Sequence, residues 1–158
     1  MKRLSILALL IGCAPAEKPV APVAPQPDAE PRTCALPPHG DAPPGQYMPM
    51  KLVETHRIAG VLGLAPRDLT KEHMHEEGIA AVRAEVRMCL DEAGVPNALR
   101  MNSGTCVKDY DASILERMAE WRYKPFEING KPAGICTDVT FVYRQSNVRA
   151  AGQGTVTF

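Results

Sequence analysis

The sequence has no excess of charge, because 18 Lys and Arg residues balance 18 Asp and Glu residues among its 158 residues. It has no basic stripe, which excludes the surfaces by which proteins hold nucleic acid or anionic lipid. It has no apolar run near the ~20 residues that a membrane-spanning helix needs. It also has no Cys-x-x-Cys pair, which argues against a redox-active motif and against a four-thiolate zinc site.

Catalytic and metal-binding patterns are missing as well. No nucleophile, base and orienting group occur together, so we expect neither an enzyme nor a bound cofactor. On a helix, His73 and Glu77 would share one face at a spacing of four residues, whereas His75 would point elsewhere. Two such ligands make a weak metal site. We therefore expect a solvated polar face there and no metal site.

The N-terminus carries an export signal. Lys2 and Arg3 precede a run of about nine apolar residues, which is too short to span a bilayer. An ordinary secretory signal peptide would explain this run. The tetrapeptide Leu10-Ile11-Gly12-Cys13 also matches the bacterial lipobox, in which the cysteine thiol accepts a diacylglyceryl group. We expect a signal peptide at residues 1–12 and a permanent lipid anchor on Cys13, and the lack of Asp after the cysteine favours the outer membrane over the inner one.

Proline is concentrated in one segment, since eleven of the fifteen prolines lie between Pro15 and Pro49. Proline fixes φ and removes an amide donor, and the segment has few large apolar residues, so it cannot build a core. We expect residues 13–49 to form a disordered, semi-extended spacer. It is either a tether that holds a domain away from the membrane or a leader that adds only solubility. Cys34 lies within it, which suggests that its distal part is bonded to the domain.

Ordinary composition begins after the prolines. Residues 50–78 form a bridging segment with a short helix that starts at Pro66 and stops at Gly78. Residues 79–145 then show the patterns of an α+β domain, with three alternating segments and a helical stripe before the last of them. The predicted strands are 80–90, 95–102 and 135–143.

The order strand, strand, helix, strand predicts a three-stranded antiparallel sheet. Its third strand runs antiparallel to the first, so the spatial order is 2-1-3, with the helix on the apolar face. Pro96 cannot donate to a ladder, which makes the second strand an edge. Asn102-Ser103-Gly104 should then break that strand, and Asn129-Gly130-Lys131-Pro132 should form the turn before the last one.

The helix supplies the predicted core. Asp109 or Asp111 can cap its N-terminus. Apolar residues recur every three to four positions up to the chain's only tryptophan, and a proline ends the helix. These structural residues are Ile114, Leu115, Met118, Trp121 and Pro125.

The topology also predicts how the cysteines pair. Cys89 lies near the end of the first strand and Cys136 near the start of the third, both on the face away from the core. Antiparallel pairing brings these ends side by side, within disulfide reach. Cys34 and Cys106 pair by elimination, which leaves only the lipidation cysteine.

A family resemblance rests on motifs in a fixed order. They are Asp91-Glu92-Ala93-Gly94, Asn102-Ser103-Gly104, Tyr110-Asp111, Trp121-Arg122-Tyr123-Lys124-Pro125, Gly130-Lys131-Pro132 and Val139-Thr140-Phe141. Residues 79–144 thereby resemble the C-terminal domain of TonB-type energy transducers. That family binds a short extended peptide, the TonB box of outer-membrane transporters, as an added strand beside its third strand. The resemblance implies a partner-binding edge strand that comprises Ile135, Thr137, Asp138, Val139, Thr140, Phe141, Val142 and Tyr143.

The chain departs from this family because no membrane-spanning helix is predicted after Cys13. We expect a lipoprotein of the Gram-negative cell envelope whose TonB-like domain faces the periplasm. It would act as a binding module or accessory energy transducer for an outer-membrane transporter or another periplasmic protein. The alternative is a structural envelope lipoprotein that forms a homodimer or docks on the cell wall. Residues 146–158 form a tail that is either disordered or an added edge strand.

Overall fold

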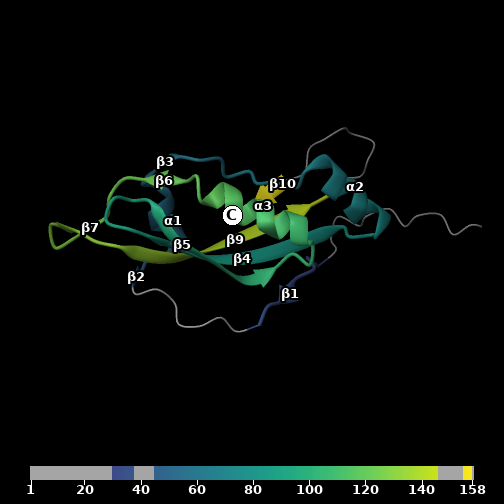
Figure 1. The fold of residues 1–158 in the computed structure, drawn as a ribbon, viewed down its shortest axis with the longest axis horizontal. Helices are drawn as coiled ribbons and strands as arrows, with labels where there is room; N and C mark the ends of the chain where they lie inside the picture. Colours follow the sequence, from purple (N-terminus) through teal and green to yellow (C-terminus); the bar gives the residue numbers. More distant parts are fainter. Residues whose placement is uncertain (1–29, 38–44, 146–154, 158) are drawn as a thin grey trace, which may run out of the picture.

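The fold is α+β, as expected. A computed structural model describes residues 30–37, 45–145 and 155–157. One curved sheet carries helix α3 (Lys108–Met118) across one face (Figure 1). The lipobox, Cys13 and most of the proline-rich segment lie outside the described residues. Within the described ranges, no helix has the length and apolar character needed to cross a membrane.

Three antiparallel strands form the centre of the sheet. They are β4 (Ala81–Leu90), β5 (Pro96–Gly104) and β9 (Ile135–Arg144), in the spatial order β5-β4-β9. These neighbours are the ones that the order 2-1-3 predicts. Strands β4 and β9 pair along their full length, from Ala81 opposite Arg144 to Leu90 opposite Ile135. The predicted alternation holds because one face packs under α3 and the other does not.

The sheet is larger than predicted, with six strands among the described residues. The additions are β1 (Cys34–Ala35) on β5, β2 (Gln46–Tyr47) in parallel on β9, and β10 (Thr155–Thr157) in antiparallel on β9. Both β1 and β2 lie in the range predicted as a disordered spacer, and β10 lies in the predicted tail. The expectation of three strands was wrong because pairings of two or three residues are too short to leave an alternating pattern.

Strand β5 continues further than predicted. Its hairpin with β4 is closed by Asp91, whose Oδ1 accepts hydrogen bonds from the amides of Ala93 and Val95 at 2.9 Å. Gly94 has a φ of +79°, and a Cβ there would collide with the carbonyl of Tyr123. The strand continues through the predicted break at Asn102-Ser103-Gly104 and ends at Gly104. A bulge shifts the register between Val86 and Glu85, and Ser103 thereby stays paired with Glu85.

The helix ends earlier than predicted, at Met118, so Trp121 lies beyond it. Arg122–Tyr123 forms strand β6, which pairs with β3 (Arg57–Ala59). Pro125 is exposed, so its placement in the core and its role as helix terminator were both wrong. The cause is tertiary, since the pairing with β3 draws the chain out of the helix before the proline is reached.

The capping prediction was also wrong. The residue at the N-cap is Val107, which makes no side-chain cap bond. The Asp111 carboxylate instead accepts hydrogen bonds from the amide and hydroxyl of Thr105, at 2.8 and 2.7 Å. Asp109 and Asp111 lie in the first turn, where a negative charge stabilises the helix dipole.

The core draws on the bridging segment as well as on the sheet and α3. That segment forms α1 (Met50–Glu54), β3 and α2 (Asp68–Glu76). Its Val53, Leu64 and Met74 are at most 1% exposed and share one core cluster with Trp121. Trp121 Nε1 donates a 3.1 Å hydrogen bond to the Val61 carbonyl, which fastens this segment over the end of α3.

The remaining predicted elements are present. Ile114 and Met118 are fully buried, and Leu115 is partly buried against the same cluster. Asn129 and Gly130 both have positive φ and form the two-residue loop of a small hairpin. The hairpin strands are β7 (Glu127–Ile128) and β8 (Lys131–Pro132).

Candidate functional site

The predicted partner-binding residues all lie in β9, but they divide between its two faces. Those that point to the core are buried: Ile135, Thr137, Val139, Phe141 and Tyr143. Those on the other face are partly exposed: Asp138, Thr140 and Val142. A partner at this strand would therefore meet backbone groups and the second set of side chains.

The free part of this edge is shorter than the predicted range 135–143. Strand β2 covers one end, opposite Ile135 and Cys136, and β10 covers the other, opposite Val142 to Arg144. Between them, residues 137–140 pair with β4 on one side and with no strand of the described chain on the other. We call residues 137–140 the open stretch. An unpaired stretch of sheet edge is a template for another strand.

The ladder shows which backbone groups the open stretch offers. The Cys136 carbonyl accepts a 2.8 Å hydrogen bond from the Met48 amide, so Cys136 directs its backbone away from β4. The Gln145 amide donates to Ala80 O at 2.9 Å, on the β4 side. Because backbone direction alternates along a strand, Asp138 and Thr140 point the same way as Cys136. Two N–H groups and two C=O groups therefore face outward between β2 and β10.

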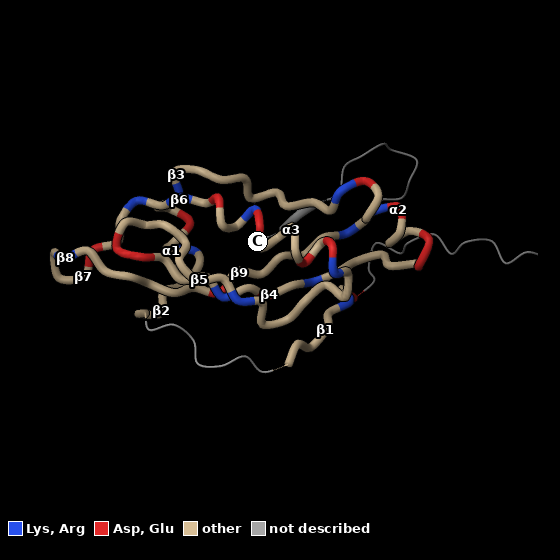
Figure 2. Tube along the Cα trace, in the orientation of Figure 1, with Lys and Arg blue, Asp and Glu red and all other residues tan. Residues whose placement is uncertain are grey.

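A salt bridge fixes the charge beside the open stretch. The Arg87 Nε and Nη2 donate to the two Asp138 carboxylate oxygens at 2.8 and 2.7 Å. This hydrogen bonding raises the pKa of Arg87 above its ordinary value. The Arg87 guanidinium also lies 5.9 Å from the centre of the Tyr47 ring, which is 57% exposed. Basic and acidic residues are interleaved along the described chain (Figure 2).

A buried disulfide lies at the β2 end of the open stretch. Cys89 and Cys136 are directly opposite in the ladder, with Cα atoms 4.0 Å apart, and are 3% and 5% exposed. A Cβ at Gly45 would lie 2.6 Å from Cys136 Sγ, so the chain leading into β2 packs on this bridge. The predicted pairing is confirmed, and the pair by elimination, Cys34–Cys106, is confirmed too.

Sequence reasoning missed two residues of this site. Arg87 could have been found, because the predicted pairing of the first and third strands places it opposite Asp138. Tyr47 carried no signal, because its two-residue strand has no detectable period. Its contact with Arg87 depends on β2 returning to the β9 edge.

The other candidate surfaces have less to offer chemically. A groove of about 580 Å³ lies on the sheet face away from α3, with Arg83, Glu85 and Val142 among its lining residues. Arg83 and Glu85 pair with each other. His73 Nε2 on α2 lies 3.5 Å from Oε1 of Glu77, the residue after the helix, and both side chains are exposed. Among the described residues, no group of three or more His, Cys, Asp or Glu side chains could hold a metal ion.

The fold and the edge together describe a two-layer α+β domain with one sheet edge partly open. In comparisons with protein-family models, curated proteins and solved structures, no match to this chain was found. The resemblance to TonB-type domains stays a prediction from the motifs.

Proposed function

We propose that this domain is a binding module that takes up an extended segment of another protein as an added strand at the open stretch. The observation that carries this proposal is the pair of outward-facing residues, Asp138 and Thr140, between two covered ends. Main-chain groups of this kind supply affinity in strand addition, and alternate side chains supply selectivity. No catalytic step forms part of the proposal.

The open stretch limits the length of strand that a partner can add. About four residues of an incoming strand fit along the open stretch without displacing β2 or β10. Each backbone hydrogen bond contributes about 0.5–1.5 kcal/mol net, so four contribute at most about 6 kcal/mol. That energy corresponds to a dissociation constant of tens of micromolar at best. Side-chain contacts beside Tyr47 and Arg87 must therefore supply any tighter binding.

The proposed setting is the envelope of a Gram-negative bacterium. Two disulfides support an oxidising compartment, and the lipobox supports an anchor on Cys13, in the outer membrane rather than the inner one. The TonB-like motifs favour an outer-membrane transporter or another periplasmic protein as partner, with the chain as accessory energy transducer. The observed strand order β5-β4-β9, in which the third predicted strand lies beside the first, supports the same proposal.

The test is site-specific crosslinking from the full chain in cells. A photoreactive amino acid at Thr140 should capture an extended segment of a transporter or other periplasmic protein. The matched control places the same group at Asn97, an exposed residue of β5 on the far side of β4. Cys13→Ala should reduce capture by releasing the chain from the membrane. Exclusive self-crosslinks or cell-wall material from Thr140 would instead favour the structural lipoprotein.

A further inference from the structure

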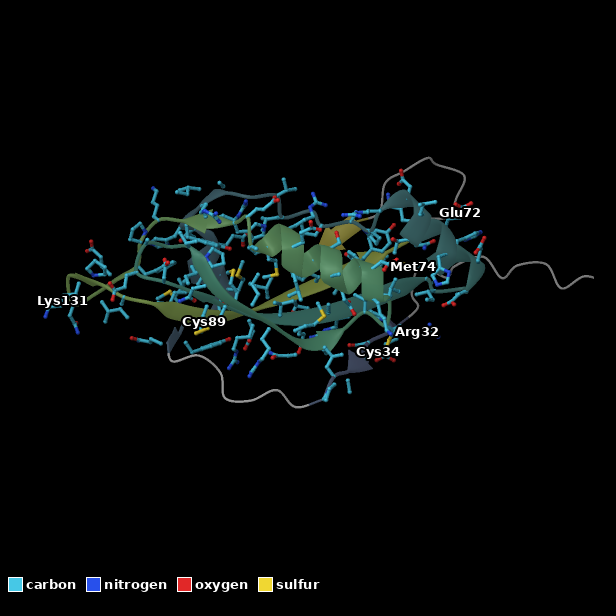
Figure 3. All side chains as sticks on the ribbon, viewed as in Figure 1. Arg32, Cys34, Glu72, Met74, Cys89 and Lys131 are labelled. Carbon is cyan, nitrogen blue, oxygen red and sulfur yellow. A yellow bond between two sulfur atoms is a disulfide. The ribbon has the colours of Figure 1, made fainter. Side chains whose placement is uncertain are left out.

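The two disulfides lie at opposite ends of the sheet. Cys34 lies beside the end of β5, where β1 pairs with Gly104, whereas Cys89 lies near the far end of β4 (Figure 3). Cys34–Cys106 fastens the N-terminal segment to the loop before α3, and Cys89–Cys136 fastens β4 to β9. The Cys34–Cys106 bridge is therefore attached to the segment that leads to the N-terminus, and the Cys89–Cys136 bridge is attached to the proposed binding strand, β9.

The bridges overlap in sequence, with separations of 72 and 47 residues. Cys89 precedes Cys106, so the shortest covalent route from Cys34 to Cys136 does not follow the chain. It crosses to Cys106, runs back through β5 to Cys89, and crosses to Cys136. Only about 17 residues of backbone lie on this route, and they extend to at most about 60 Å.

We propose that the two disulfides form a covalent load path that carries tension from the N-terminal segment to β9. The proposal rests on the proposed function in one respect, namely that a partner held on β9 supplies the opposing load. A chain under tension extends only until its shortest covalent route is taut. Residues 35–88 lie off that route, so pulling from the N-terminus cannot unravel α1, α2 or most of β4.

The load path protects the binding edge itself. Strand β2 pairs with β9 through only Gln46 and Tyr47, and a two-residue pairing would peel away at low force. Cys34 precedes β2 in the chain and takes the load first. The β2 end of the open stretch, with the Tyr47 ring beside Arg87, is therefore shielded from tension.

Both ends of the path are reinforced. At the entry, the Arg32 amide donates to Ala81 O at 2.9 Å, and its carbonyl accepts from the Arg83 amide at 2.8 Å. Thr105, next to Cys106, is held by Asp111. At the exit, Cys136 immediately precedes the open stretch and is bonded to the strand that β9 pairs with along its full length.

The test stretches single molecules of the oxidised full chain between a handle at the N-terminus and one at an azide-bearing residue in place of Thr140. Counted from residue 34, unfolding should release at most about 75 Å of chain. Removing one bridge should raise this to about 210 Å in Cys34→Ser/Cys106→Ser and to about 120 Å in Cys89→Ser/Cys136→Ser. Adding reductant to a wild-type molecule held under tension should lengthen it in steps, as each disulfide is reduced. This measurement uses no variant, so it remains valid if one of the variants fails to fold.

The proposal is overturned if the oxidised wild type releases as much chain as Cys34→Ser/Cys106→Ser. It is also overturned if the wild type and this variant unfold at the same force. The handle at position 140 replaces any partner, so this result does not depend on strand addition. Failure of the crosslinking experiment with success here would leave the load path standing without the proposed partner.

Discussion

Removing the Cys89–Cys136 bridge is expected to destabilise the fold more than removing the Cys34–Cys106 bridge, although its loop is shorter. From loop length alone, separations of 47 and 72 residues correspond to about 4.0 and 4.4 kcal/mol of chain entropy at 25 °C. This model therefore gives the Cys34–Cys106 bridge a slightly larger effect. The native structure reverses the order.

The reversal comes from what each bridge holds in the folded state. Cys89 and Cys136 are 3% and 5% exposed and lie within a fully paired ladder, so Cys89→Ala/Cys136→Ala also loses buried contacts worth about 1 kcal/mol. The expected total is about 5 kcal/mol. Without its bridge, Cys34 is kept in place by a two-residue strand and a few backbone bonds. Residues 30–37 then gain freedom in the folded state too, which lowers the net cost to about 2–3 kcal/mol.

Urea unfolding of the two double variants and the parent measures this difference. All three carry Cys13→Ala, so that no free thiol from that position reshuffles the remaining bridge. The slope with urea should be similar for both variants, which makes the extrapolated free energies comparable. An equal or larger loss for Cys34→Ala/Cys106→Ala would refute the reasoning from native-state packing.

Three further predictions follow from single features. The amides of Asp138 and Thr140 should exchange with deuterium faster than the alternate β9 amides that face β4, and equal protection would contradict the open stretch. Gly60→Ala should lower the free energy of unfolding in urea by about 2–4 kcal/mol, because Gly60 has a φ of +102° and the new Cβ would collide with the buried indole of Trp121. Gly63→Ala is the control: a Cβ there would have no atom within 4 Å, so it should change stability by less than about 1 kcal/mol. Burial raises the pKa of Tyr110, so the folded protein keeps the phenol proton at pH values where the unfolded chain has lost it. The free energy of unfolding from this group is therefore constant below about pH 10, the ordinary pKa of tyrosine, and falls as the pH rises above it. Tyr110→Phe should therefore show a shallower fall of Tm between about pH 9 and 11, and an unchanged slope would count against this assignment.

The sequence predicted the three central strands and their order because alternation is a local property of each strand. Once strand order was set, the opposed positions of Cys89 and Cys136 followed, and with them the second bridge. The helical stripe of Ile114 and Met118 was equally visible, since its period comes from the helix itself.

Features that depend on distant partners were beyond a reading of local patterns. Trp121 leaves the helix because its indole bonds to Val61 and the next residues pair with β3, 60 or more positions earlier in the chain. Likewise, the bridging segment contributes Leu64 and Met74 to the core, and no periodic pattern in its sequence predicts these contacts.

The amino-acid sequence by itself determined that β9 is a half-buried strand beside β4, because its alternating side chains permit only that burial. Only the tertiary structure decided how much of its outer edge is available. Strands β2 and β10 bind that edge through two or three backbone pairs each, and such pairings depend on where the chain is delivered rather than on which side chains it carries.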